Sequence, residues 1–247
     1  MKIAIIGYGK MGKTIERLAL AAGHTVPVVL DYPAEEGNPA TNQENWISML
    51  QTVDVAIEFT RPEAAPANIT LCLEAGVPVV CGTTGWLDHY QDIARLVEAR
   101  AGTLFYASNF SIGVNLFFAL NRWLARLMQD KPDYQAALTE IHHIHKLDAP
   151  SGTALTLAQG LLEEIPSLEK WALQPEYTPG VLPIQAIREG EVPGTHLVEY
   201  RSAVDSITIR HEAYSREGFA QGAIHAAEWV LGKKGIFNMG DMLGLAI

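Results

Sequence analysis

The chain has 247 residues, 48% of them hydrophobic and 19% charged, which allows one large domain or two modest ones with a sizeable core. A formal net charge of -10 argues against a nucleic-acid partner, because binding phosphates requires a basic face. No apolar run approaches the roughly 20 residues of a membrane span, so we expect no membrane partner.

The opening residues Met1–Gly7 are typical of a core strand, not of a cleavable signal segment, so we expect a cytoplasmic protein. The two cysteines, Cys72 and Cys81, lie in apolar surroundings without metal or redox spacing, which predicts buried free thiols. An anionic substrate would need a local cluster of cations to overcome the acidic charge of the whole chain.

Short β-branched apolar runs alternate with helical stretches through about the first 110 residues. Helical periodicity is found in Thr14–Ala22 and Tyr90–Ala101. The predicted strands are Ile3–Ile6, Val26–Leu30, Val53–Phe59, Val77–Val80 and Leu104–Ala107. Strands with little polar alternation are typical of a sheet covered on both faces. The predicted fold class is therefore α/β, with a Rossmann-type doubly wound parallel sheet.

A glycine-rich loop follows the first predicted strand and opens a helix. Gly7-Tyr8-Gly9-Lys10-Met11-Gly12 has the G-x-G-x-x-G spacing that lets backbone approach a pyrophosphate at a helix N-terminus. Asp31 stands about 20 residues on, where an acid would bind the adenosine ribose hydroxyls. Tyr32 follows it in place of an Arg or Lys for a 2′-phosphate, which favours NADH over NADPH. The alternative is a glycine turn beside a surface aspartate.

Two further segments follow predicted strands and reach the same carboxyl edge of the sheet, where open α/β folds bind ligands. Phe59-Thr60-Arg61-Pro62 follows one strand and places Arg61 within reach of a cofactor. Gly82-Thr83-Thr84-Gly85 follows the next, and its backbone could lie close to a ring. A structural turn and a solvated arginine are the alternatives for these two segments.

The pattern changes after Phe110, and we place a domain boundary near Ser111. A long amphipathic helix is predicted over Val114–Met128, followed by strand-like segments that look antiparallel and indicate an α+β domain. These segments are Val181–Arg188, Thr195–Ser202 and Ser206–His211. A last helix over Phe219–Leu231 could pack on either domain.

The densest group of reactive side chains is the run Glu140-Ile141-His142-His143-Ile144-His145-Lys146. Three of the chain's eight histidines fall within four positions. If the run is a strand, its period of two places His142 and Lys146 on one face. A proton donor and a cation on one face suit a substrate that receives a hydride and a proton.

An anion site is predicted directly after this run. Ser151-Gly152-Thr153 leads into the helical stretch Ala154–Leu162, so hydroxyls and unpaired amides converge where a carboxylate could dock. Two alternatives remain open, which are a zinc site and histidines that satisfy hydrogen bonds in the core. The spacing lacks the common zinc-helix pair and the adjacent lysine opposes a cation, so we expect no metal.

Taken together, these segments resemble the dihydrodipicolinate reductase family over nearly the whole chain. The resemblance rests on the glycine loop and on the stretch from His142-His143 to Thr153-Ala154. Further matching segments are Phe59-Thr60-Arg61-Pro62-Glu63, Gly82-Thr83-Thr84-Gly85, Asn109-Phe110-Ser111-Ile112-Gly113-Val114-Asn115, Arg188-Glu189-Gly190, Gly194-Thr195-His196 and Gly235-Ile236-Phe237-Asn238-Met239.

The resemblance implies a dinucleotide-binding Rossmann domain formed by residues 1–110 and 216–247. Residues 111–215 would form a substrate-binding α+β domain that also builds a homotetramer. The implied reaction reduces the cyclic dicarboxylate 4-hydroxy-tetrahydrodipicolinate to tetrahydrodipicolinate, with loss of water, in lysine biosynthesis through diaminopimelate. The implied hydride donor is NADH or NADPH.

Matching positions also imply roles for individual residues. His142 would be the proton donor and Lys146 the companion catalytic cation, and the latter would also bind substrate. The substrate carboxylates would be held by His143, Ser151, Gly152 and Thr153. The cofactor would be bound by Gly7, Gly9, Lys10, Met11, Gly12, Asp31, Phe59, Thr60, Arg61, Gly82, Thr83, Thr84, Ala107, Asn109 and Phe110.

The chain departs from many family members in two places, since its glycine loop is one residue shorter and Tyr32 stands where an arginine is common. Two other functions stay open. One is a reductase of a different small carboxylate, and the other is a non-catalytic module that senses NADH. A proton donor paired with a lysine argues against the sensor.

Overall fold

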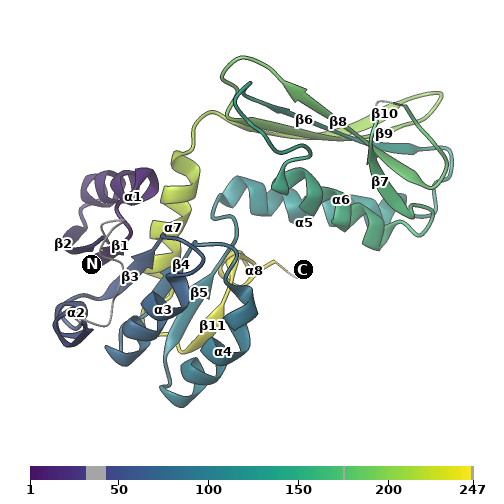
Figure 1. Ribbon diagram of the computed structural model, residues 1–247. Helices are drawn as coiled ribbons and strands as arrows, with labels where there is room; N and C mark the ends of the chain where they lie inside the picture. Colours follow the sequence, from purple (N-terminus) through teal and green to yellow (C-terminus); the bar gives the residue numbers. More distant parts are fainter. Residues whose placement is uncertain (32–42, 175, 246–247) are drawn as a thin grey trace. The chain divides into compact units, whose positions relative to one another are not determined.

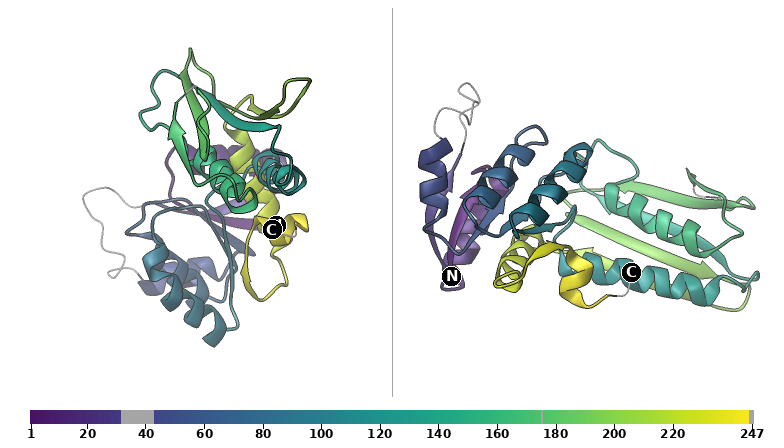
Figure 2. Two further views of the ribbon diagram at one scale, coloured as in Figure 1. Left: turned by 90° about the vertical axis from the view of Figure 1, so that its right-hand side faces the viewer. Right: turned by 90° about the horizontal axis from the view of Figure 1, so that it is seen from below.

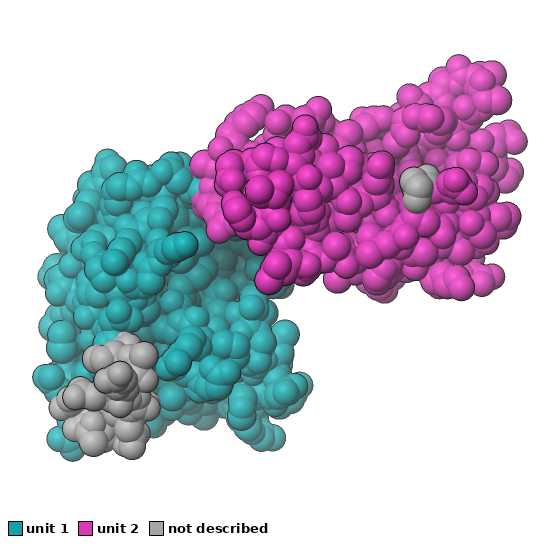
Figure 3. Space-filling model, turned by 45° about the horizontal axis from the view of Figure 1, so that its top comes forward, with its two compact units in different colours: residues 1–112, 217–246 teal, residues 113–216, 247 magenta. Residues whose placement is uncertain are grey.

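The computed structural model describes residues 1–31, 43–174 and 176–245. Contacts divide the chain into two compact units, coloured separately in Figure 3. Unit 1 consists of Met1–Ile112 and Glu217–Ala246, and unit 2 consists of Gly113–Arg216. Each unit has its own apolar core.

Unit 1 is built on a six-stranded sheet in the order β11-β5-β4-β3-β1-β2, with every neighbouring pair parallel. Its strands are β1 (Lys2–Ile6), β2 (Thr25–Leu30), β3 (Val55–Glu58), β4 (Val79–Cys81), β5 (Thr103–Tyr106) and β11 (Gly235–Phe237). The chain begins at β1 in the interior of the sheet, adds β2 on one side and then adds β3, β4, β5 and β11 in turn on the other, as in a doubly wound fold. The predicted fold class is confirmed.

Helices cover both faces of this sheet (Figures 1 and 2). Alternate residues of β1 explain why, because Ala4 and Ile6 enter one core while Ile3 and Ile5 enter the other. The first core is covered by α2 (Gln43–Leu50), α3 (Ala65–Glu74) and α4 (Tyr90–Ala99), and the second by α1 (Lys10–Ala21), α7 (Glu217–Trp229) and α8 (Met239–Leu243). A 3-10 turn, Leu87–His89, precedes α4.

The predicted strands of unit 1 are all present, with ends shifted by at most two residues. The last long helix, which pattern could not assign to a domain, packs in unit 1 as α7. The short strand β11 escaped prediction because three residues carry too little periodicity. Cys72 and Cys81 are buried free thiols as predicted, and burial raises the pKa of both.

Unit 2 contains a five-stranded sheet in the order β10-β9-β6-β8-β7. Its strands are β6 (Gln135–His142), β7 (Lys170–Leu173), β8 (Val181–Arg188), β9 (Gly194–Arg201) and β10 (Ser206–Ala213). Strands β9 and β10 are antiparallel as predicted, but β8 does not pair with β9. It pairs in parallel with β6 and β7, so the antiparallel prediction for Val181–Arg188 is wrong.

The reason is that β6 inserts between β8 and β9, which are consecutive in the chain. The loop that joins them therefore passes the carboxyl end of β6 and bonds to it. His143 N–H donates to Val192 O at 2.8 Å, and Glu189 N–H donates to His142 O at 2.8 Å. This crossing loop holds the end of β6, where the histidine run begins.

Helices α5 (Ile112–Met128) and α6 (Gly152–Glu164) pack along one face of the unit 2 sheet (Figure 1). Along β6, every second residue faces these helices and is buried. Ala136 and Leu138 contribute apolar surface, whereas Glu140 and His142 continue the same row with polar side chains. Across residues 1–31, 43–174 and 176–245, no helix has the length and apolarity that a bilayer crossing requires.

Candidate active site

The predicted cofactor-binding segments of unit 1 all follow strands at the carboxyl edge of its sheet. Backbone hydrogen bonds extend the strand pairing into these loops. Gly7 N–H donates to Leu30 O, Phe59 N–H to Ile6 O, and Gly82 N–H to Glu58 O. Ala107 N–H donates more weakly, at 3.3 Å, to Cys81 O. Segments far apart in the sequence therefore lie side by side.

The glycine loop has the shape that backbone approach to a phosphate requires. A Cβ at Gly7, whose φ is +93°, would lie 2.1 Å from Phe59 O, and a Cβ at Gly12 would lie 2.1 Å from Gly7 O. A Cβ at Gly9 would meet no protein atom within 4 Å. Gly9 is also the N-cap of α1, and no side chain caps that helix. Lys10, Met11 and Gly12 form its first turn, whose N–H groups have no partner inside a helix.

Asp31 lies directly after β2 and is exposed. Its Oδ1 accepts a hydrogen bond from Tyr8 N–H at 3.1 Å, which ties the glycine loop to the end of β2. This position suits an acid that contacts the ribose of a bound dinucleotide. Tyr32, on which the expectation for NADH also depends, lies outside the described residues.

Aromatic rings and small residues gather beside the glycine loop. The ring centroids of Phe59 and Phe110 lie 5.7 Å apart, and a Cβ at Gly82 would collide with the Phe59 ring. Thr60 N–H donates to Thr83 Oγ1 at 2.7 Å, while the Thr60 hydroxyl donates to the buried Glu58. The other predicted members of this group divide by exposure, with Ala107 buried, Asn109 half-buried and Arg61 and Thr84 exposed.

These features fit a nicotinamide dinucleotide. The open space at Gly9, the uncapped start of α1 and the acid at the end of β2 match its pyrophosphate and ribose. The segments after β3, β4 and β5 contribute the aromatic and glycine surface that a ring could lie against.

In unit 2, the histidine run does not continue as a strand. β6 ends at His142, and a turn follows in which Lys146 N–H donates to His143 O at 3.1 Å. The period of two therefore does not reach Lys146, and the expectation that strand geometry places it on one face with His142 is wrong. The crossing loop between β8 and β9 accounts for the change, because it takes the backbone bonds of His143 and Ile144.

His142 is buried, with 7% of its surface exposed, and its ring lies against a carboxylate. Nδ1 lies 2.5 Å from Oε2 of Glu140, which is fully buried. This separation makes a close contact between the imidazole and the carboxylate. On the other side of the ring, a Cβ at Gly194 would lie 3.1 Å from Nε2.

The second oxygen of Glu140 has two donors of its own. Oε1 accepts from Ser151 N–H at 3.2 Å and from Arg188 Nη2 at 3.0 Å. Burial would raise the pKa of this carboxyl, but hydrogen bonds from His142, Ser151 and Arg188 outweigh it and lower the pKa to about 2. Glu140 is therefore an anion at neutral pH.

His196 is a second buried imidazole in this cluster. Its ring meets the His142 ring edge to face, with centroids 5.1 Å apart, and its Nε2 lies 3.1 Å from Ser151 Oγ. Burial, followed by the charge of His142, lowers the pKa of His196 to about 4. His196 is therefore neutral at neutral pH and adds no charge beside His142.

Ser151 begins α6 as its N-cap. Its Oγ accepts from Ala154 N–H at 3.2 Å, so one hydroxyl both starts the helix and contacts His196. Gly152 and Thr153 form the first turn and are exposed and half-buried, respectively. Their N–H groups face out of the helix start, as an anion site requires.

Cations surround the turn that follows His142. Lys146 Nζ lies 2.8 Å from both oxygens of Asp148, and this pairing lowers the pKa of that carboxyl. Arg188 holds the same turn through the carbonyls of Lys146 and Asp148, at 3.3 and 2.6 Å. Arg216 Nη2 lies 3.1 Å from His143 Nε2. This local group of cations opposes the acidic charge of the whole chain.

Among the residues that the structure describes, one group could offer three ligand atoms to a metal ion. These residues are Glu140, His142 and His196, whose ligand atoms lie within 4.8 Å of one another. The Arg188 guanidinium already balances the charge of this carboxylate, which opposes a second cation. The absence of a metal stays a prediction.

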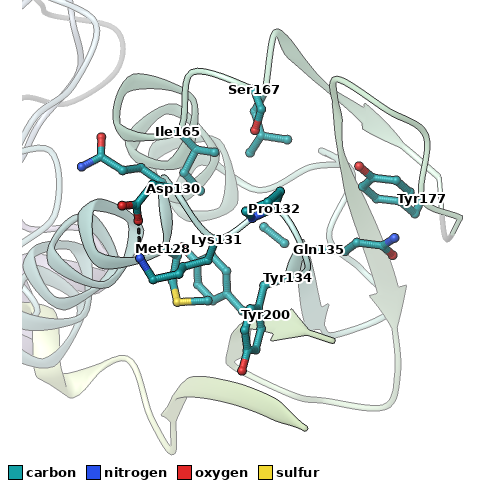
Figure 4. Close-up of a pocket in the computed structure, with 13 residues that line it drawn as sticks. Met128, Asp130, Lys131, Pro132, Tyr134, Gln135, Ile165, Ser167, Tyr177 and Tyr200 are labelled. Atoms are coloured by element: carbon teal, nitrogen blue, oxygen red, sulfur yellow. Dashed lines mark hydrogen bonds and ion pairs between the residues drawn. The ribbon is translucent and has the colours of Figure 1, made fainter. Parts of the chain in front are cut away.

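A cavity of about 360 Å³ lies elsewhere in unit 2, at the start of β6 (Figure 4). It is separated from His142 by the length of that strand. None of the predicted site residues is among its lining side chains, which include Met128, Tyr134, Ile165 and Tyr200. The cavity therefore has no part in the histidine cluster.

Four residues that were not predicted as site residues also contact the cluster around His142, and these are Glu140, Arg188, Gly194 and His196. All four lie in segments with recognisable sequence patterns, but their contacts join β6 to β8 and β9 and so depend on the strand order of the sheet. A carboxylate two residues before a histidine on a strand was the one available signal, because such residues share a face.

Comparison with known proteins places the whole chain. Residues 1–110 match the family model "Dihydrodipicolinate reductase, N-terminus", and residues 113–243 match "Dihydrodipicolinate reductase, C-terminus". A 4-hydroxy-tetrahydrodipicolinate reductase of Christiangramia forsetii is 48% identical over 243 residues, which cover 98% of each chain. One of Ralstonia nicotianae is 34% identical, covering 99% of this chain and all of that one.

A solved structure has the same fold throughout. It is a dipicolinate-bound dihydrodipicolinate reductase from Paenisporosarcina sp. TG-14, with a TM-score of 0.77 and 26% identity, covering 96% of this chain and 97% of that one. Both halves of the chain, and both units of the fold, thus agree on one assignment. The chain belongs to the dihydrodipicolinate reductase family, which comprises NAD(P)H-dependent oxidoreductases of lysine biosynthesis.

Proposed function

We propose that this chain reduces 4-hydroxy-tetrahydrodipicolinate to tetrahydrodipicolinate with loss of water. The observation that carries the proposal is the cluster at the end of β6, where an imidazole beside a buried carboxylate, a lysine and a helix N-terminus come together. The 48% identical relative bears the name of this activity, and the dipicolinate in a related structure supports a cyclic dicarboxylate as ligand.

Unit 1 binds the nucleotide in this proposal, and unit 2 binds the substrate. Gly9 and the first-turn amides of α1 hold the pyrophosphate, while Asp31 holds the ribose. The bound cofactor supplies the hydride. The first turn of α6, with Ser151, Gly152 and Thr153, binds one substrate carboxylate together with His143 and Lys146.

His142 donates the proton that must accompany the hydride. Its ring is held on one side by the Glu140 carboxylate, while Nε2 lies on the other side next to Gly194, where no side chain intervenes. Lys146 supplies positive charge beside the reacting dicarboxylate. Its exposed pair with Asp148 is a weak interaction, so a substrate carboxylate can compete for the ammonium.

The test follows NADH absorbance with cyclic dicarboxylate freshly generated from pyruvate and aspartate semialdehyde. We expect His142→Gln to lower kcat about 10²–10⁴-fold, in the range of a lost general acid. Lys146→Ala should lower kcat/KM as strongly, with folding and NADH binding unchanged. Turnover equal to wild type in both variants contradicts the assigned roles. Turnover absent from the wild type itself contradicts the substrate.

For the cofactor, we propose NADH as the preferred hydride donor. An aspartate at position 31 accepts hydrogen bonds from ribose hydroxyls and repels a 2′-phosphate. We expect a lower KM for NADH than for NADPH. Asp31→Asn should weaken NADH binding and so narrow the difference between the two KM values. Steady-state kinetics with both nucleotides measures this, and the reverse order of KM values would overturn the proposal.

The assembly and compartment follow from the family resemblance, and we propose a homotetramer in the cytoplasm. Light scattering coupled to size-exclusion chromatography measures the assembly, for which four copies of the 27.0 kDa chain are expected.

A further inference from the structure

The two carboxylate oxygens of Glu140 have different surroundings. Oε1 accepts from Ser151 N–H and from the Arg188 guanidinium, whereas Oε2 lies 2.5 Å from His142 Nδ1. The side chain is fully buried, so water cannot exchange for any of these partners.

We propose that Glu140 is the positioning residue of His142, because it determines which ring nitrogen carries the proton. In the neutral ring the proton is on Nδ1, facing Glu140, and Nε2 exchanges a proton with the substrate. This inference rests on the proposed function, in which His142 is the proton donor.

The surroundings of the ring favour this arrangement. An ionised carboxylate only accepts, so a lone pair on Nδ1 would face a negative oxygen at 2.5 Å and be repelled. Ser151 and Arg188 hold Oε1, so the carboxylate cannot turn away. The neighbouring His196 has its pKa lowered to about 4, chiefly by burial, and so places no second cation beside the ring.

The strand pairing explains why these groups meet. Glu140 and His142 are two residues apart on β6 and share a face. His142 is in register with Arg188 on β8, and Glu140 is opposite His196 on β9. The N-terminus of α6 supplies the Ser151 amide, whose partial positive charge favours the anion.

Glu140→Gln reverses the preference while keeping the volume of the side chain. Ser151 N–H and Arg188 are both donors, so they retain the amide oxygen of the introduced side chain and leave its NH2 group facing Nδ1. That NH2 group donates to Nδ1, and the neutral ring must then carry its proton on Nε2. Such a ring has no carboxylate to stabilise its imidazolium form, and losing the Nε2 proton would create an imidazolate. In serine proteases the equivalent carboxylate-to-amide change costs about 10⁴ in kcat through the wrong tautomer.

The experiment compares wild type, Glu140→Gln and Glu140→Asp, with Glu163→Gln as matched control on the surface of α6. It measures kcat and KM for the cyclic dicarboxylate, NADH binding, and the urea midpoint of unfolding. In parallel, 15N solid-state NMR of histidine-labelled protein, assigned with His142→Gln, reads the tautomer of the neutral His142 ring.

For Glu140→Gln we expect kcat to fall about 10²–10⁴-fold with KM changed less than about five-fold. The tautomer should change from Nδ1–H in the wild type to Nε2–H in the variant. Glu140→Asp keeps a carboxylate, so it should keep Nδ1–H and recover part of kcat. Glu163→Gln should behave as wild type in every measurement.

Several outcomes overturn the inference. Nε2–H in the wild type does so by itself, so the test does not require Glu140→Gln to fold. An unchanged tautomer in Glu140→Gln does so as well, because any loss of activity would then be structural. If His142→Gln keeps full activity, the assigned role of His142 as proton donor fails instead, and if the wild type itself shows no turnover, the proposed function fails. If His142→Gln is inactive while Glu140→Gln is active, the positioning role alone fails.

Discussion

At the scale of single residues, the chemistry proposed for unit 2 depends on what surrounds one imidazole. His142 has a carboxylate on one side and a glycine on the other. The carboxylate is an anion because three donors outweigh its burial. The glycine leaves Nε2 open, since a side chain at position 194 would occupy the space beside it. In the proposed reaction, His142 therefore depends on two residues that do not themselves react.

The first residue-scale prediction concerns this glycine. A Cβ at position 194 would lie 3.1 Å from His142 Nε2 and 3.3 Å from its Cδ2, closer than ordinary contact. We expect Gly194→Ala to shift the imidazole and to lower kcat/KM about ten-fold or more, since small misplacements of a reacting group are costly. Steady-state kinetics measures the loss, and calorimetry should show NADH binding unchanged.

The matched control is Gly218→Ala in α7, where the nearest atom to a new Cβ, Ser111 Oγ, lies at 3.8 Å. We expect it to leave both activity and stability unchanged within error. Full activity in Gly194→Ala would show that the space beside Nε2 is not needed for turnover.

At the scale of elements, each unit has a helix N-terminus after a strand among the residues proposed to bind a ligand. α1 begins after β1 with no capping side chain, whereas α6 begins with Ser151 as its N-cap. An uncapped start suits a ligand that supplies the missing acceptors, such as a pyrophosphate. The capped start of α6 uses its hydroxyl to join the helix to His196.

The element-scale prediction separates two glycines of the same loop. A Cβ at Gly12 would lie 2.1 Å from Gly7 O, so Gly12→Ala must displace the backbone between β1 and α1. We expect it to lower the free energy of unfolding by about 1–3 kcal/mol. Gly9→Ala meets no protein atom within 4 Å and should change stability by less than about 0.5 kcal/mol.

Nucleotide binding then distinguishes the two variants. Gly9→Ala should raise the Kd for NADH about ten-fold or more, because its methyl group occupies the space assigned to the pyrophosphate. Urea unfolding and fluorescence titration with NADH measure the two effects separately. A Gly9→Ala protein that binds NADH as wild type would move the pyrophosphate away from this loop.

At the scale of the whole molecule, the buried ionisable groups of unit 2 make stability depend on pH. The pKa of His196 is 6.5 in the unfolded chain and about 4 in the folded protein, mainly because burial disfavours the charged form of the ring. Between these values the unfolded chain binds a proton that the folded protein does not. Protonation of His196 therefore favours the unfolded chain. The stability linked to its neutral form is fully present above pH 6.5 and is lost as the pH falls toward 4.

Glu140 adds a second loss at lower pH. Its pKa falls from 4.5 to about 2 despite burial, because hydrogen bonds favour the anion. Its contribution is present above pH 4.5 and is lost as the pH falls toward 2. Each group contributes roughly 3 kcal/mol, since one pKa unit corresponds to about 1.4 kcal/mol.

The prediction is that the free energy of unfolding, measured by urea titration, falls between pH 6.5 and 4 in the wild type. His196→Gln should remove a large part of this dependence, because a neutral side chain has no proton to gain, and a remainder belongs to His211, whose pKa burial also lowers. His225→Gln, at an exposed position on α7, is the control and should keep it. A steep dependence that persists in His196→Gln would assign the acid sensitivity to other groups.

The sequence by itself determined the local features of this protein. Runs of β-branched residues predicted five of the six strands of unit 1, and glycine spacing predicted a loop between β1 and α1. The clustered histidines identified the end of β6. These signals are local because backbone propensity, side-chain period and turn chemistry act within a few residues.

The tertiary structure decided how those pieces meet. Glu140 contacts Arg188, 48 residues away in the chain, and Ser151 contacts His196 at a separation of 45. Both contacts depend on β6 lying between β8 and β9, a strand order that no local pattern contains. In the positioning role that we propose for Glu140, the tautomer of His142 therefore depends on the order of strands in a sheet.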